Sequence, residues 1–243
     1  MTEPLPPVGA NSAFFFDFDG TLVAIAPRPD LVHVEPEVSD LLRALARRFG
    51  GAVAVITGRP LDVADGFLGP LVLPAAAEHG SVRRDVSGRV HVREAGAEAI
   101  GAAYRALEPL AEANPGLILE RKSSSVALHY RQQPELAEAC AAAVEDVVAK
   151  NPSLVILPGK MVFELKPEGV DKGVAVRTFL NEPPFKGRVP VYIGDDVTDE
   201  HAFAVVNALG GITIKVDDGD TQAKYRTDRK GLFEWLSRVV EGR

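Results

Sequence analysis

The chain has 243 residues, of which 46% are hydrophobic and 25% charged, and its formal net charge at pH 7 is −7. This composition is typical of a globular protein with one large or two small domains, and the negative charge argues against general nucleic-acid binding and against an anionic membrane surface. The single cysteine, Cys140, excludes an intrachain disulfide, and no signal peptide or membrane-spanning run is expected, so the predicted compartment is the cytoplasm.

The first predicted element is a short buried strand over the aromatic run 14–16, which the segment FFFDFDGTL continues with Asp17 and Asp19. Parallel strands place ligands at this end, and buried carboxylates need a partner such as Mg²⁺, which takes oxygen ligands. One Asp can then attack phosphorus, while a second exchanges protons with the leaving oxygen and with water. The alternative is an ordinary strand end followed by a turn.

A helix over 35–49 and a buried strand over 52–56 come next, which makes the strand–helix–strand unit of a parallel sheet. Thr57 follows this strand with a hydroxyl and free backbone N–H groups, which suit a phosphate. A simple helix cap is the alternative for Thr57, and Arg59 is expected to have a structural role. A further apolar strand is expected over 71–77.

The order of predicted elements changes at Ser81, where pairs of adjacent strands separated by single helices replace the strand–helix–strand units. The expected elements are a hairpin around Ser87-Gly88, a helix over 95–113, two strands over 117–131, a helix over 135–150 and two strands over 154–165. This order predicts an antiparallel sheet with two helices on one face. Because parallel-sheet signals resume afterwards, the predicted fold class is α/β: a Rossmann-like parallel-sheet core (residues 1–80 and 167–243) with an inserted α+β cap domain (residues 81–166).

After the insertion, Asp171 is predicted to cap a helix that runs to about residue 180, with Lys172 in its first turn. A cation there opposes the helix dipole, which indicates a fixed anionic partner, although an exposed lysine is the alternative. The strand over 189–193 then ends at GDDVTDE, which places Asp195 and Asp196 at another strand end. A last strand is expected over 211–216, followed by an amphipathic helix.

Four segments in this order, DFDGT, ITGR, DKG and GDDVTDE, resemble the motifs of the haloacid dehalogenase superfamily of phosphatases. The resemblance implies that Asp17 is the nucleophile and Asp19 the acid/base. It implies that Thr57 holds a phosphoryl oxygen and that Lys172 bridges Asp17 and the phosphoryl group. The implied Mg²⁺ ligands are the carboxylates of Asp17 and Asp195 and the backbone carbonyl of Asp19. Asp196 is expected to reach the metal through water or to hold Lys172, and Asp199 to support the metal site.

The stretches ERKSSSVALHYR, GKMVFELKPEGVDKG and GDDVTDE resemble trehalose-6-phosphate phosphatases, and the likeness runs from residue 14 to about residue 216. It implies an enzyme of trehalose biosynthesis that hydrolyses trehalose 6-phosphate to trehalose and phosphate. The residues implied to contact the disaccharide all lie in the cap: Glu120, Lys122, Arg131, Lys160 and Glu164. A solvated charged face is what composition alone favours for them.

Three alternatives stay open: a capped phosphatase for sucrose phosphate or mannosyl-phosphoglycerate, a phosphomutase, and a non-catalytic sugar-phosphate-binding domain. The expected partner is a small-molecule sugar phosphate, and neither nucleic acid nor a membrane is expected. A trehalose-phosphate synthase is a candidate protein partner, and the chain is expected to be a monomer.

Overall fold

The computed structural model describes residues 4–25, 32–92, 97–122 and 124–243. The chain divides into two compact units: unit 1 comprises residues 1–91 and 171–243, and unit 2 comprises residues 92–170. Residues 95 and 96 of the predicted 95–113 helix, and residue 123 within the two strands predicted over 117–131, lie outside the described residues. Within the described ranges, no helix has both the length and the apolar character needed to cross a membrane.

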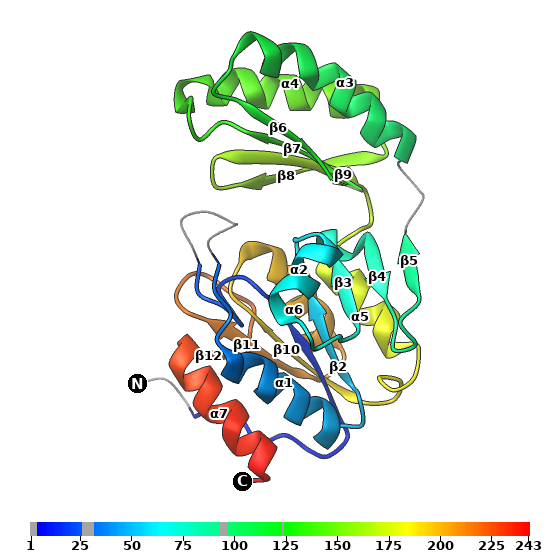
Figure 1. Cartoon of the computed structure of the whole chain (residues 1–243), viewed down its shortest axis with the longest axis vertical. Coiled ribbons are helices and arrows are strands. Elements are labelled where there is room, and N and C mark those ends of the chain that lie inside the picture. Colours follow the sequence, from blue (N-terminus) through cyan, green and yellow to red (C-terminus); the bar gives the residue numbers. More distant parts are fainter. Residues whose placement is uncertain (1–3, 26–31, 93–96, 123) are drawn as a thin grey trace. The chain divides into compact units, whose positions relative to one another are not determined.

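Unit 1 is built on an eight-stranded sheet with the strand order β12-β11-β10-β1-β2-β3-β4-β5 (Figure 1). The parallel strands are β1 (Ser12–Phe16), β2 (Val53–Ile56), β3 (Ala75–Ala77), β10 (Val189–Gly194), β11 (Ile212–Val216) and β12 (Tyr225–Thr227). A short 3₁₀ helix, η2 (Glu78–Gly80), follows β3. The predicted Rossmann-like parallel core is therefore confirmed.

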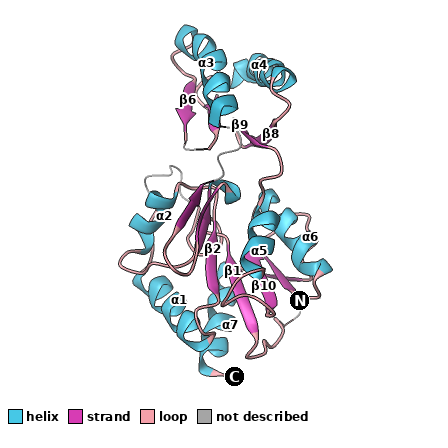
Figure 2. Cartoon of the chain, turned by 90° about the vertical axis from the view of Figure 1, so that its right-hand side faces the viewer, coloured by secondary structure: helices cyan, strands magenta, loops and turns pink. Residues whose placement is uncertain are grey.

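Helices cover both faces of this sheet, as Figure 2 shows for α1 and α7 on one side and α5 and α6 on the other. The helices of unit 1 are α1 (Pro36–Arg48), α2 (Leu61–Leu68), α5 (Lys172–Leu180), α6 (Glu200–Ala208) and α7 (Arg229–Glu241), with the 3₁₀ helix η4 (Val197–Asp199) before α6. Strand β1 contributes to both cores, because alternate side chains point to opposite faces. Phe14 and Phe16 belong to the core that contains residues of α1 and α7, and Phe15 belongs to the core of α5 and α6. Burial of each ring stabilises the fold by roughly 1.5–3 kcal/mol. Because the rings lie in two different cores, packing holds β1 on both faces of the sheet.

The edge of the sheet differs from the sequence-based expectation. β4 (Val82–Arg84) pairs antiparallel with β3, and β5 (Val90–Val92) lies next to β4, so this hairpin extends the core sheet. The sequence assigns the hairpin to the insertion, whereas the compact units divide at residue 92 and again at residue 171. A local hairpin pattern does not reveal which sheet it joins, since that depends on a pairing partner elsewhere in the chain. The strand expected over 71–77 is also shorter, because Pro74 lacks the N–H needed to extend it.

Unit 2 is a four-stranded antiparallel sheet with two helices packed on one face (Figure 1). The strands, in the order β6-β7-β9-β8, are β6 (Ile118–Arg121), β7 (Val126–His129), β9 (Val162–Pro167) and β8 (Leu154–Gly159). The helices are α3 (Ala97–Ala113) and α4 (Ala137–Lys150), and the 3₁₀ helix η3 (Pro134–Leu136) precedes α4. Side chains from both helices and the sheet form a hydrophobic core that is separate from the two cores of unit 1. The inserted α+β domain is thus confirmed.

Candidate active site

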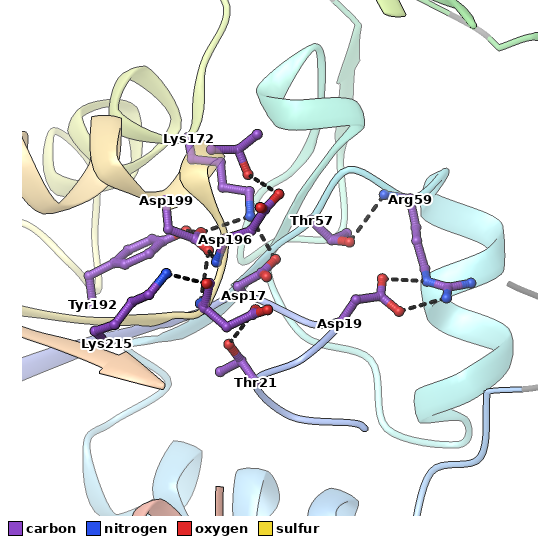
Figure 3. A network of polar contacts seen from close by, with 12 residues as sticks. Asp17, Asp19, Thr21, Thr57, Arg59, Lys172, Tyr192, Asp196, Asp199 and Lys215 are labelled. Carbon is purple, nitrogen blue, oxygen red and sulfur yellow. Dashed lines mark hydrogen bonds and ion pairs between the residues drawn. The ribbon is translucent and has the colours of Figure 1, made fainter. Parts of the chain in front are cut away.

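The functional side chains of unit 1 gather where its central parallel strands end. Asp17 follows β1 directly, Thr57 follows β2, and Asp195 follows β10. Because β1 pairs with both β2 and β10, the carboxyl ends of these three strands are neighbours in the sheet. Lys172 is the first residue of α5, which Asp171 caps by accepting a hydrogen bond from the Val174 N–H at 2.8 Å. Figure 3 shows Lys172 directed toward Asp17.

Asp17 and Lys172 form a buried ion pair. Lys172 Nζ lies 2.8 Å from Asp17 Oδ1, and the two side chains are only 2% and 6% exposed. Burial, reinforced by the nearby charge of Asp199, raises the pKa of Asp17 well above its ordinary value, although Lys172 opposes the rise. Burial alone would lower the pKa of Lys172, but Asp17 and Asp199 outweigh it and hold that pKa above its usual value. The lysine therefore carries a fixed positive charge against the predicted nucleophile.

Asp199 holds the rest of the site in place. Its Oδ1 accepts hydrogen bonds from Lys172 Nζ and from the Tyr192 hydroxyl, both at 2.7 Å. Its Oδ2 accepts the backbone N–H groups of Asp195 at 3.1 Å and Asp196 at 2.9 Å. Both oxygens of this fully buried carboxylate thus have donors, which ties the turn after β10 to the lysine on α5.

Asp195 and Asp196 differ in their surroundings. Asp195 Oδ1 accepts a hydrogen bond from Thr21 Oγ1 at 3.1 Å, and its backbone carbonyl accepts one from the buried Lys215 ammonium. Burial raises the pKa of Asp195 to about 6. Asp196 instead caps η4 in a reciprocal arrangement with Asp199. The partner that holds Lys172 in the structure, besides Asp17, is therefore Asp199.

The acidic cluster fits a divalent cation. One carboxylate oxygen from each of Asp17, Asp195 and Asp199 lies within 4.8 Å of the others. Burial raises the pKa of both Asp17 and Asp195, so their ionised forms are costly in this site, and a bound cation would offset that cost. Oxygen donors of this kind suit a hard cation. Because the oxygens of Asp199 already accept four hydrogen bonds, Asp17 and Asp195 are the carboxylates best placed to hold the metal.

Asp19 points elsewhere. Its Oδ1 lies 2.6 Å from Arg59 Nη2 and its Oδ2 lies 2.6 Å from Arg59 Nε. Figure 3 shows the Asp19 side chain turned toward Arg59, while Asp17 faces Lys172. Thr57 is fully buried, and its Oγ1 accepts the Arg59 backbone N–H at 3.1 Å. This hydrogen bond closes the turn that follows β2.

Gly20 is the feature of the first motif that sequence reasoning left unexplained. Its φ is +80°, and a Cβ built there would lie 2.0 Å from Asp195 Oδ2. We expect Gly20→Ala to push Asp195 aside and to weaken the binding of a divalent cation at the acidic cluster by about tenfold or more, measured by calorimetric titration with Mg²⁺. Gly88→Ala is the matched control, because Gly88 has φ +85° and open space around it. Equal Mg²⁺ affinity in the two variants would contradict this role for Gly20.

Several supporting residues escaped the sequence-based prediction. Lys215 left a signal, since it is a charged residue inside the apolar run ITIKV of β11. The sequence holds no such signal for Tyr192, because an aromatic residue in a buried strand is typical of a hydrophobic core. Arg59 was assigned a structural role, and only the structure reveals its two contacts with Asp19.

The predicted sugar contacts lie in unit 2 and fall into two groups. Lys122 Nζ lies 3.2 Å from Glu164 Oε1, which also accepts a hydrogen bond from Ser125 Oγ at 2.6 Å. Glu120 and Glu164 are both paired with Ala127 in the strand register, so the two carboxylates share one face of the sheet. His129 Nε2 lies 2.9 Å from Glu120 Oε2, and this contact lowers the pKa of Glu120.

Arg131 and Lys160 form the second group. Arg131 follows the end of β7, and Lys160 lies in the turn between β8 and β9. Arg131 Nη2 donates to the Lys160 backbone carbonyl across 3.5 Å, and both residues are exposed. These two cations are therefore loosely held, in contrast to the buried Glu164.

Comparisons with known proteins agree with this picture. A family model described as trehalose-phosphatase matches residues 15–230. "Trehalose-6-phosphate phosphatase" of Escherichia coli (strain K12) is 41% identical over 247 residues, covering 99% of this chain and 92% of the relative. "Probable trehalose-phosphate phosphatase" of Sinorhizobium fredii (strain NBRC 101917 / NGR234) is 42% identical over 208 residues, covering 85% and 78%. The solved structure of a "trehalose-6-phosphate phosphatase related protein" has a TM-score of 0.78 at 28% identity, covering 94% and 97%.

The parallel core with its inserted unit, the order of the motifs and these matches define a phosphatase of the haloacid dehalogenase superfamily. More narrowly, the chain belongs to the trehalose-phosphatase family. The family resemblance read from the sequence is thereby confirmed.

Proposed function

We propose that this protein hydrolyses trehalose 6-phosphate to trehalose and phosphate, with Mg²⁺ as cofactor and a phosphorylated Asp17 as intermediate. The observation that carries the proposal is the buried contact between Asp17 and Lys172, beside Asp195, in a chain of the trehalose-phosphatase family. A carboxylate at a strand end, with a cation fixed 2.8 Å away, is arranged for attack on an electron-poor centre that carries negative oxygens.

In the first half of the reaction, a carboxylate oxygen of Asp17 bonds to phosphorus and the bond from phosphorus to the sugar oxygen breaks. Lys172 offsets the negative charge that develops on the phosphoryl oxygens. The Thr57 hydroxyl and the Gly58 backbone N–H orient those oxygens. The expectation of several free N–H groups in this turn is wrong, because the N–H of Thr57 donates to the Ala76 carbonyl and that of Arg59 to the Thr57 hydroxyl. Asp19 gives its proton to the leaving sugar oxygen, so that a neutral hydroxyl departs rather than an alkoxide.

In the second half, Asp19 takes a proton from water, and the water oxygen bonds to phosphorus as the bond to Asp17 breaks. Free phosphate leaves, and Asp17 and Asp19 return to their starting states. Mg²⁺, held by Asp17, Asp195 and the Asp19 backbone carbonyl, would supply positive charge to the phosphoryl oxygens and help to orient them.

The disaccharide is proposed to bind through Glu120, Lys122, Arg131, Lys160 and Glu164. Carboxylates and cations on one face of a sheet suit sugar hydroxyls, which both donate and accept hydrogen bonds. The contact between Lys122 and Glu164 supports this, because each group orients the other and leaves further hydrogen-bonding capacity for a ligand. Cytoplasmic location, a monomeric state and association with a synthase remain predictions.

Phosphate release from a panel of sugar phosphates tests this function. We expect trehalose 6-phosphate to exceed sucrose phosphate and mannosyl-phosphoglycerate in kcat/KM by about 100-fold or more, since a site that makes several hydrogen bonds to one sugar discriminates strongly against sugars that cannot make them. Lys122→Met should raise KM for trehalose 6-phosphate by about tenfold and leave the hydrolysis of p-nitrophenyl phosphate unchanged. A panel without preference, or equal effects of Lys122→Met on both substrates, would argue against the assignment.

Metal binding should stabilise the protein in a pH-dependent way. The pKa of Asp195 is about 6 instead of its ordinary 3.8, so in the metal-free protein its ionisation costs stability as the pH rises between these values. Mg²⁺ needs the ionised carboxylate and therefore binds better above pH 6. We expect Mg²⁺ to raise Tm more at pH 7.5 than at pH 5, measured by thermal denaturation with and without chelator. An equal rise at both pH values would contradict this prediction.

A further inference from the structure

The contact between Asp19 and Arg59 has a geometry that an incidental surface ion pair rarely has. Two parallel N–H groups of one guanidinium meet the two oxygens of one carboxylate, each at 2.6 Å. Such bidentate pairs are stronger and more directional than single contacts. The Arg59 side chain is 13% exposed and the Asp19 side chain is 38% exposed, so the pair is sheltered from water on the arginine side and open on the carboxylate side.

Arg59 is itself held in place by its surroundings. Its guanidinium lies 5.0 Å from the ring centre of Phe67 and 5.8 Å from that of Phe18. Its backbone N–H donates to Thr57 Oγ1, and its backbone carbonyl accepts the Glu78 N–H at 3.1 Å. A cation packed against two neighbouring rings, on the turn that carries Thr57, can hold a nearby carboxylate in one orientation.

We infer that Arg59 is the positioning residue for the acid/base Asp19; this inference rests on the proposed function. In the observed bidentate state both Asp19 oxygens are occupied by Arg59, and Figure 3 shows the carboxylate turned away from Asp17. Rotation of the Asp19 side chain frees one oxygen to exchange a proton with the leaving sugar oxygen, while the other oxygen keeps a single contact with the guanidinium. Arg59 thus limits Asp19 to two orientations, which lowers the entropy that the carboxylate loses on reaching the reactive orientation.

The leaving group distinguishes this role from a merely structural one. A sugar alkoxide needs a proton on departure, whereas p-nitrophenolate does not, so only the first substrate depends on where Asp19 points. We expect Arg59→Met to slow the first turnover of trehalose 6-phosphate by about tenfold, measured by rapid quench. The burst of p-nitrophenolate from p-nitrophenyl phosphate should change by less than about twofold. Arg59→Lys should recover part of the loss, because an ammonium can still make the single contact.

A double-mutant cycle and a matched control complete the test. In an Asp19→Ala background, adding Arg59→Met should slow the first turnover no further, because the residue that it positions is gone. Arg83→Met is the control, since Arg83 also pairs with a carboxylate, Glu182, and lies 5.2 Å from the ring centre of Phe179. In this control variant, the first-turnover rates of trehalose 6-phosphate and p-nitrophenyl phosphate should keep their wild-type ratio.

The outcomes separate the inference from the function beneath it. Failure of the wild-type protein to hydrolyse trehalose 6-phosphate, or an Asp19→Ala variant that slows both substrates equally, would overturn the proposed function or its acid/base step. A normal wild type and a selective Asp19→Ala, together with an Arg59→Met that is unselective or additive, would overturn the role of Arg59 alone.

Discussion

Asp17→Asn should abolish phosphate release from trehalose 6-phosphate, with a loss of roughly 10⁴-fold or more, as expected when a covalent nucleophile is removed. An amide of the same size keeps the shape of the site, but it is a far weaker nucleophile than a carboxylate. The fold and the binding of the sugar phosphate should survive. Phosphate release, circular dichroism and calorimetric titration with trehalose 6-phosphate would measure the three properties on one preparation.

Asp228→Asn is a suitable control for this substitution. Asp228 caps α7 by accepting the Gly231 N–H at 2.6 Å, and Asn caps helices about as well as Asp. The control should retain full turnover. Appreciable turnover by Asp17→Asn would refute the assignment of the nucleophile, whatever the state of the other residues.

Lys172→Met should damage both stability and catalysis. It would leave the buried carboxylates of Asp17 and Asp199 without the ammonium that now lies 2.8 and 2.7 Å from them. Removing one member of a buried ion pair costs about 3–5 kcal/mol, and losing a charge that stabilises the transition state costs about 10²–10³ in kcat. Urea denaturation in the presence of chelator and single-turnover kinetics at saturating Mg²⁺ would measure the two losses separately.

The losses of stability and turnover in Lys172→Met should come from the burial of this lysine and not from the removal of a positive charge alone. Lys230→Met removes an exposed lysine whose nearest carboxylate, Glu234, lies 3.9 Å away, and it should change stability by less than about 0.5 kcal/mol. If Lys172→Met were as mild as this control in both assays, Lys172 would not be the charge that the site depends on.

The position of a predicted site residue was foreseeable from the sequence wherever that residue lies at the end of an element. Asp17, Thr57 and Asp195 each follow an apolar strand, and parallel strands bring such ends together whatever their separation in the chain. The helix cap at Asp171 was foreseeable for the same reason, because its consequence is local. The family resemblance then added the chemistry.

The contact of Lys172 with Asp17 was expected only through the family resemblance, and other contacts between side chains on different elements were not foreseeable. Nothing in the chain before folding relates Tyr192 to Asp199, or Arg59 to Asp19, because these pairings depend on rotamers and on how helices pack. The same holds for the β4–β5 hairpin, whose local pattern is clear but whose partner strand is set by the edge left open at β3. The sequence therefore predicts where the candidate site residues lie, whereas the hydrogen bonds and ion pairs between them are known only from the structure.

The separate hydrophobic core of unit 2 has a consequence for how such a protein diversifies. Side chains on the face of its sheet that the two helices do not cover lie outside this core, so they can be exchanged without disturbing the aromatic residues that pack around β1 in unit 1. Under the proposed division of roles, a lineage could acquire a new sugar preference through changes in one module while inheriting an unaltered phosphate-cleaving apparatus in the other.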